Sequence, residues 1–237
     1  QIEDKLKELY PGVRTLRMDA DTTRTKDSYE KILSAFSNGE ADVLIGTQMI
    51  VKGHDFPKVT LVGILAADLS LNASDYRAGE RTFQLLTQAV GRAGRGGLPG
   101  EAVIQTYQPD HYAITCAAAQ DYKSFYEEEI LYRELSGYPP AAHMLAVQIY
   151  GKEEENVKQL AQRLTDVVKS NMDFLQILGP TPANISKIND IYRYVFYAKH
   201  AEYDTLVAVK DCVEETLRQW QPRQLSIQFD FDPVNVL

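Results

Sequence analysis

Hydrophobic residues in the first half of the chain recur with helical spacing in some segments and run continuously in others. Four of them lie at i, i+3, i+4 and i+7 within residues 26–37, and Asn38-Gly39 follows, which predicts an amphipathic helix that ends there. The run from Thr60 to Ala67 is continuously apolar, as is typical of a strand buried on both faces of a parallel sheet. The same criteria predict helices over 2–9 and 79–91 and strands over 13–18, 42–46 and 101–107. This alternation favours an α/β fold with a doubly wound parallel sheet, in which ligands sit at the carboxyl ends of the strands.

The pattern changes beyond residue 120. An acidic, tyrosine-rich helix is predicted over 122–135, and Gly137 and Pro139-Pro140 end it. The elements predicted after it are strand 142–150, helix 153–169, strand 174–188, strand 190–198, helix 202–219 and strand 224–231. This βαββαβ order favours a ferredoxin-like α+β sandwich with both helices on one face. We therefore expect a first domain over 1–120, a linker helix and boundary over 121–140, and a smaller α+β domain over 141–237.

The distribution of charge argues against a protein that holds nucleic acid by bulk electrostatics. The 237 residues carry a formal net charge of −8. Residues 1–120 hold 13 basic and 15 acidic side chains, and residues 121–237 hold 12 and 18, so neither part has the basic excess of a non-specific DNA-binding module. Any contact with nucleic acid must then be local and built on specific groups.

Signals for a membrane or a metal are not found in the sequence. No apolar run approaches the roughly 20 residues of a membrane span, and no signal peptide precedes the first helix, so we expect a cytoplasmic protein without membrane contact. Cys116 and Cys212 stand far apart without metal-binding spacing, which indicates free thiols. The chain begins at Gln1 already in helical periodicity, as expected of a piece of a longer protein.

Two segments carry the residue types of a phosphate and nucleic-acid site. Residues 46–55 (GTQMIVKGHD) come directly after a predicted strand, where a tight turn places backbone N–H groups and short polar side chains at the ligand edge of the sheet. Residues 88–95 (QAVGRAGR) lead from a helix into a glycine-rich loop, where Arg92 and Arg95 offer forked donors to phosphate oxygens. Taken singly, the first is also consistent with a plain strand-to-helix connection and the second with a solvated loop.

In this order on a parallel α/β pattern, the two segments resemble motifs V and VI of superfamily-two helicases. The strings around them sharpen the resemblance to the primosomal protein N′ family, the PriA replication-restart helicases, and extend it over nearly the whole chain. These strings are GTQMIVKGHDFP (46–57), ADL (67–69), DYRAGER (75–81), QLLTQ (84–88), GRAGRGG (91–97), YPP (138–140), GPTPA (179–183) and DFDP (230–233).

The resemblance implies that the first domain is a RecA-like second helicase lobe and assigns roles to residues of its first motif. Thr47 and Gln48 would contact DNA, with Thr47 on the backbone of the tracked strand. Gly53 and Asp55 would face the nucleotide, with Asp55 near the ribose. The first motif would therefore serve both DNA and nucleotide.

The second motif would complete the nucleotide site. By the same resemblance, Gln88 would couple the nucleotide pocket to the DNA site. Arg92 and Arg95 would reach the γ-phosphate, and Arg95 would be the arginine finger. Asp68 would lie on the loop that links the nucleotide state to the grip on DNA.

Two motor elements of the family are not found in this sequence. It has no GxxxxGK[ST] phosphate loop and no DExH box after a strand, so ATP and Mg²⁺ would be held mainly by a first lobe outside this chain. The chain alone is therefore expected to be inactive in ATP hydrolysis. The cysteine-rich zinc insertion of the family is also absent, and zinc is expected only in the full-length protein.

The family resemblance implies an ATP-dependent 3′-to-5′ DNA helicase that acts in replication restart and primosome assembly. The implied partners are forked or single-stranded DNA, single-strand-binding protein and primosome proteins. One alternative is a DNA-translocating ATPase that does not separate strands. A second is that the C-terminal half serves as a DNA- or protein-binding module.

Aromatic residues of the predicted 190–198 strand allow two interpretations. Tyr192, Tyr194 and Phe196 alternate along one face, and Arg193 lies opposite them. Such a face on a βαββαβ sheet either stacks single-stranded bases or packs as core beneath the two helices, and the core interpretation is favoured.

Overall fold

The computed structural model describes residues 1–23, 26–51, 56–94, 99–172, 174–222 and 224–234, and the chain divides into two units. Unit 1 comprises Gln1–Leu71 and Gly79–Phe125, and unit 2 comprises Asn72–Ala78 and Tyr126–Leu237. The chain therefore enters unit 2 twice, first with a short segment that lies between two elements of unit 1. The expected domain limits at residues 120 and 140 stay a prediction. None of the helices in the described ranges is long and apolar enough to span a membrane.

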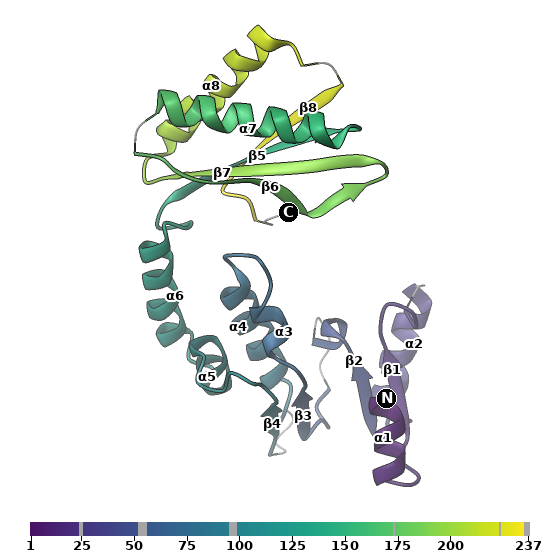
Figure 1. Ribbon diagram of the computed structural model, residues 1–237. Coiled ribbons are helices and arrows are strands. Elements are labelled where there is room, and N and C mark those ends of the chain that lie inside the picture. The colour runs from purple at the N-terminus through teal and green to yellow at the C-terminus, as the bar shows by residue number, and fades with distance from the viewer. Residues whose placement is uncertain (24–25, 52–55, 95–98, 173, 223, 235–237) are drawn as a thin grey trace. The chain divides into compact units, whose positions relative to one another are not determined.

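Unit 1 is built from short parallel strands and the helices that connect them (Figure 1). β1 pairs with β2 and β3 pairs with β4, in both cases in parallel. The helices predicted over 2–9, 26–37 and 79–91 are confirmed within one residue at each end. The element bounds are α1 (Ile2–Leu9), β1 (Thr15–Met18), α2 (Lys26–Ser37), β2 (Val43–Gly46), the 3₁₀ helix η1 (Gln48–Val51), β3 (Leu61–Ile64), α3 (Asp68–Leu71), α4 (Ala78–Val90), β4 (Glu101–Ile104), α5 (Tyr112–Ala119) and α6 (Tyr122–Ser136), which continues into unit 2.

β3 differs from the expected strand buried on both faces. Its residues alternate between exposed and half-buried positions, and Leu61 is 61% exposed. The described strands of unit 1 pair only as β1 with β2 and β3 with β4, rather than as one continuous doubly wound sheet. Alternate side chains of a strand point to opposite faces, so the alternating exposure shows that one face of β3, the face of Leu61, is not covered by packed side chains.

Two apolar clusters hold unit 1 together. In the first, the amphipathic face of α2 packs on β1 and β2, with Leu33 and Met18 buried at the contact. The second joins α4, α5 and the start of α6, where the rings of Phe83 and Phe125 stack with centroids 4.0 Å apart. The sequence did not predict α5, because its alanine-rich and mostly apolar residues show no amphipathic period.

Unit 2 holds a four-stranded antiparallel sheet with α7 and α8 on one face (Figure 1). The strand order is β6-β7-β5-β8, and the elements follow one another in the predicted βαββαβ order. Asn189 and Asp190, with φ of 48° and 61°, form the two-residue turn between β6 and β7, where such angles favour Asn and Asp. The element bounds are β5 (His143–Gly151), α7 (Glu154–Asn171), β6 (Gln176–Ile188), β7 (Ile191–His200), α8 (Tyr203–Trp220) and β8 (Leu225–Phe231).

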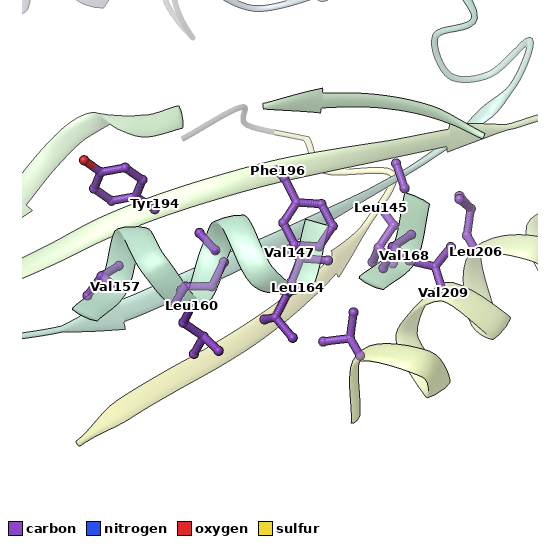
Figure 2. Close-up of a cluster of buried hydrophobic side chains, with 14 residues drawn as sticks. Leu145, Val147, Val157, Leu160, Leu164, Val168, Tyr194, Phe196, Leu206 and Val209 are labelled. Carbon is purple, nitrogen blue, oxygen red and sulfur yellow. The ribbon is translucent and has the colours of Figure 1, made fainter. Parts of the chain in front are cut away.

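The alternating aromatic residues of β7 belong to the core of unit 2. Tyr194 is 7% exposed, and Phe196 is fully buried among side chains of α7 and α8 (Figure 2). Tyr192 packs against the same cluster. Burial of a large apolar side chain contributes about 1.5–3 kcal/mol. The core interpretation is therefore confirmed for Tyr194 and Phe196, whose buried rings are closed to stacking bases, while Tyr192 is half-buried at the border of the same core.

Candidate functional site

The end of β2 is a turn that requires glycine. A Cβ on Gly46 would lie 2.3 Å from the carbonyl oxygen of Met18, the last residue of β1. The Thr47 N–H donates to that same oxygen at 3.4 Å, and the Ile50 N–H donates to the Thr47 carbonyl at 3.2 Å within η1. This backbone leaves the side chains of Thr47 and Gln48 exposed at the carboxyl end of a parallel strand, which is where α/β sheets bind ligands.

The loop after β1 shares this edge, although the sequence analysis did not single it out. Asp19 accepts a hydrogen bond from the Thr22 N–H at 3.0 Å, and this bond is the main cause that holds the pKa of its carboxyl below the ordinary value. The Thr23 hydroxyl donates to the sulfur of Met49 in η1 at 3.8 Å. No local signal in the sequence marks this loop, because its place depends on the parallel pairing of β1 with β2.

The second motif lies at the carboxyl end of α4. Gln88 is exposed in the last turn of the helix, and Arg92 is half-buried in the turn that follows. Gly94 has a φ of 75°, and a Cβ on Gly100 would lie 2.0 Å from the Gly94 nitrogen. Glycine at both positions therefore lets the backbone fold back on itself beside Arg92.

Val59 joins the two motif segments. Its carbonyl oxygen accepts a hydrogen bond from the Gly94 N–H at 3.0 Å. Its side chain packs against the same apolar cluster as Ile50 of η1. The turn that carries Arg92 and the 3₁₀ helix that begins at Gln48 are thus held by one residue.

Asp68 ties the carboxyl ends of β3 and β4 together. Its side chain is buried and accepts hydrogen bonds from the Thr106 hydroxyl, from the Tyr107 N–H at 3.0 Å and from the Gln108 N–H at 3.2 Å. These donors, the Thr106 hydroxyl first, hold the pKa of the Asp68 carboxyl below its ordinary value. Asp68, expected on a loop, is the first residue of α3, so the start of this helix is fixed to the end of β4. A role in linking nucleotide state to DNA stays a prediction.

The side chains at these edges suit phosphate binding better than metal binding. Arg92, Gln88 and Thr47 supply a guanidinium, an amide and a hydroxyl, which are groups able to donate hydrogen bonds to phosphate oxygens. The described residues contain no group of three His, Cys, Asp or Glu side chains placed to hold a metal ion.

Three of the expected site residues lie outside the described residues. Gly53 and Asp55 come shortly after η1, and Arg95 directly follows Gly94. Their roles stay predictions that rest on the motif strings.

Two families match the chain. The Helicase conserved C-terminal domain matches residues 1–97, and the Primosomal protein N C-terminal domain matches residues 134–234. The chain is 42% identical over 235 residues to the Replication restart protein PriA of Bacillus subtilis strain 168, a match that covers 98% of this chain and 29% of that protein.

Proteins of the same name from other bacteria are similar to comparable extents. The one from Chlamydia pneumoniae is 45% identical over 202 residues, covering 85% of this chain and 27% of that protein. The one from Synechocystis sp. is 37% identical over 237 residues, covering 100% of this chain and 28% of that protein. The chain thus spans less than a third of the length of each of these relatives.

Proposed function

This chain belongs to the PriA family of replication restart proteins, and on that premise we propose that it forms the second motor lobe and C-terminal domain of a DNA helicase. The helicase would be driven by ATP, move 3′-to-5′ and act in replication restart and primosome assembly. The observation that supports this most directly is the pair of contacts at Val59, one to the turn before Arg95 and one to the cluster of η1. A motor lobe needs its nucleotide-facing and DNA-facing motifs in a fixed mutual position.

We propose the domain division at residues 120 and 140, with a RecA-like lobe before it and a ferredoxin-like sandwich after it. The strand order of unit 2 supports the second assignment. β5 and β7 lie in the middle of the sheet, and each is followed along the chain by a helix and then an outer strand, β6 or β8. Two interleaved βαβ units of this kind characterise the ferredoxin-like fold.

The proposed roles of the first motif rest on the family resemblance, and the place of the motif at the end of β2 supports them. Thr47 and Gln48 contact DNA from their exposed positions. Gly53 and Asp55 face the nucleotide, with Asp55 near the ribose. DNA and nucleotide would thus be bound from the two ends of one short segment.

The proposed roles of the second motif concern phosphoryl transfer. Gln88 couples the nucleotide to the DNA site, and Arg92 and Arg95 reach the γ-phosphate, with Arg95 as the arginine finger. A first lobe outside this chain would hold ATP and Mg²⁺ through its phosphate loop and acidic box, so the chain alone should not hydrolyse ATP. In the full-length protein, zinc would also be bound elsewhere than in this chain.

The proposed partners follow from the same assignment. They are forked or single-stranded DNA, single-strand-binding protein and primosome proteins, which place the protein in the cytoplasm. Unwinding of a forked duplex is the decisive assay. If a longer form that includes the first lobe hydrolyses ATP on single strands and leaves the fork intact, a translocase takes the place of the helicase.

Arg95 provides the sharpest test of the motor assignment. In a longer form with a first lobe, Arg95→Ala should lower DNA-stimulated ATP turnover by about 10³- to 10⁵-fold, because charge that develops on the γ-phosphate loses its guanidinium. Nucleotide binding should stay within about tenfold, since the first lobe supplies most of the affinity. Arg95→Lys should rescue poorly, because an ammonium lacks the planar fork.

Arg218→Ala is the matched control, because that side chain on α8 is 70% exposed and lies outside both motifs. Its turnover should equal that of the wild type. Retention of more than about a tenth of normal turnover by Arg95→Ala would move the finger role to Arg92.

A further inference from the structure

The segment Asn72–Ala78 belongs to unit 2, although the elements on either side of it belong to unit 1. It follows α3 directly and leads into α4, which begins at Ala78. Gln88 lies in the last turn of α4, and Arg92 lies just beyond it. The helix that ends in the second motif is therefore attached at its start to a different unit from the one that contains its body.

Tyr76 attaches the segment Asn72–Ala78 to the rest of unit 2. Its ring stacks on the ring of Tyr138 with centroids 5.1 Å apart and an interplanar angle of 7°. The guanidinium carbon of Arg133 lies 5.0 Å from the centre of the Tyr76 ring. The Tyr76 hydroxyl donates to the carbonyl oxygen of Pro233 at 2.9 Å. One side chain thus contacts α6, the turn after it and the segment that follows β8.

The groups that receive Tyr76 are themselves held in place. Arg133 is 4% exposed, forms an ion pair with the buried Glu129 and donates to the Pro139 carbonyl oxygen at 2.6 Å. The ammonium of Lys199 lies 3.9 Å from the centre of the Tyr138 ring and donates to the Ser136 carbonyl oxygen at 2.7 Å. Tyr76 therefore binds to a preformed surface of unit 2.

Tyr76 lies only two residues before Ala78, the first residue of α4, and hydrogen bonds constrain the backbone between them. The Asp75 carboxylate accepts a hydrogen bond from the Arg77 N–H at 2.9 Å, and the Asp75 carbonyl accepts one from the Ala78 N–H at 3.0 Å. These bonds form the turn that leads from Tyr76 into α4. A helix of 13 residues is about 20 Å long, so a small rotation at its start displaces the residues at its end.

We propose that Tyr76 is a positioning residue that fixes the start of α4, the helix that leads to Gln88 and Arg92, for ATP hydrolysis. This inference rests on the proposed function. The residues that hold Tyr76 lie in the C-terminal part of the chain, so this part would influence the rate of ATP turnover without contacting the nucleotide. Loss of the ring should lower kcat while ATP binding through the first lobe is kept.

The kinetic test uses a longer form of the protein that includes the first lobe. Tyr76→Ala should reduce the DNA-stimulated kcat by about 10- to 100-fold, the range expected when remote packing misplaces catalytic groups. The KM for ATP should change by less than about threefold, because ground-state binding is not removed. Tyr76→Phe keeps the stacked ring and loses only the bond to Pro233, so it should retain most of the turnover. Tyr10→Ala, at a tyrosine 64% exposed after α1, is the control and should match the wild type.

Amide hydrogen exchange on the present chain separates positioning from simple destabilisation. In Tyr76→Ala, exchange should speed up in residues 72–78 and the first turns of α4, while β5, β7 and α7 keep their protection. Faster exchange throughout residues 143–231, or a kcat within twofold of the wild type, would overturn the proposal. If the wild-type longer form shows no DNA-stimulated turnover, the proposed function fails, and the exchange in α4 still decides whether Tyr76 anchors the helix.

Discussion

The central strands of unit 2 and the strands of unit 1 differ in how far their side chains are covered. Nearly every residue of β5 is buried, because α7 and α8 pack on one face and a smaller cluster around Ala146 and Val195 occupies the other. In β3 and β4, every second residue is exposed, including Leu61 and Val103 at 61% and 51%. Parallel strands are normally covered on both faces, so these exposed positions contribute little to the free energy of unfolding of unit 1.

The two units therefore differ in which residues their structures depend on. Unit 2 depends on the buried side chains of its strands, and unit 1 depends more on its strand ends and turns. In unit 2 the central strands β5 and β7 pack their side chains into one core with α7 and α8. In unit 1 the features that need a particular residue lie at strand ends and turns, as at Gly46 and Gly100. Substitutions should therefore have their largest effects in strand interiors of unit 2 and in turns of unit 1.

The largest effect on stability is expected for Phe196→Ala in β7. Removal of a fully buried ring leaves a cavity, which costs about 3–5 kcal/mol of unfolding free energy. Leu61→Ala in β3 is the matched substitution at an exposed strand position and should stay within about 0.5 kcal/mol. Urea unfolding followed by far-UV circular dichroism measures both. Equal losses for the two variants would remove the contrast between the units.

A smaller effect is expected for Gly100→Ala in the turn before β4. The added Cβ would meet backbone atoms of Gly94 at 2.0–2.3 Å, so the turn must shift, at a cost of about 1–3 kcal/mol. Gly63→Ala within β3 has no atom within 4 Å of the new Cβ and serves as the control. Thermal unfolding of the two variants measures the difference in stability. A Gly100→Ala protein as stable as Gly63→Ala would mean that the turn is not constrained as described.

The smallest expected effect is on the stability of unit 1 at low pH. Arg14 hydrogen bonds lower the pKa of Asp42 from 3.8 to about 2 and join the segment before β1 to the start of β2. Because the folded pKa lies below the unfolded value, the contribution of this pair is complete above about pH 4 and is lost as the pH falls towards 2.

Asp42→Asn should therefore flatten the fall in stability of unit 1 between pH 4 and pH 2, and the effect should be small because both side chains are about half exposed. Asp211→Asn on α8 provides a control in unit 2. Acid titrations without chemical denaturant, followed by circular dichroism, would measure the difference between the two variants. An unchanged acid transition in Asp42→Asn would show that the pair does not contribute.

The sequence predicts most of the elements, because their signals are local. The helix over 26–37 has a clear amphipathic period and a glycine stop, and the βαββαβ order of unit 2 follows from alternating runs and breaks. Choosing core over base stacking for Tyr194 and Phe196 needed only the expectation that two helices cover one face of the sheet. The motif strings likewise placed Thr47 and Gln88 at the ends of a strand and a helix.

Features that depend on distant contacts were not predictable in this way. The exposure of Leu61 depends on which elements cover each face of β3, and a continuous apolar run does not specify this. The loop at Asp19 needs the register of β1 with β2 before its place beside Thr47 is evident. The attachment of Tyr76 to unit 2 depends on partners far along the chain, and its own string gave no sign of them.

The hydrogen bond from Tyr76 to Pro233 joins residues 157 positions apart. A ribosome adds about 5–20 residues per second, so the acceptor is made roughly 8 to 30 seconds after the donor. Throughout that interval the start of α4 has no complete binding surface, because β8 and the segment after it are still to be synthesised. Docking of Tyr76 is thus completed only after β8 and Pro233 have been made, and the start of the helix that bears the second motif is fully restrained only from that point on.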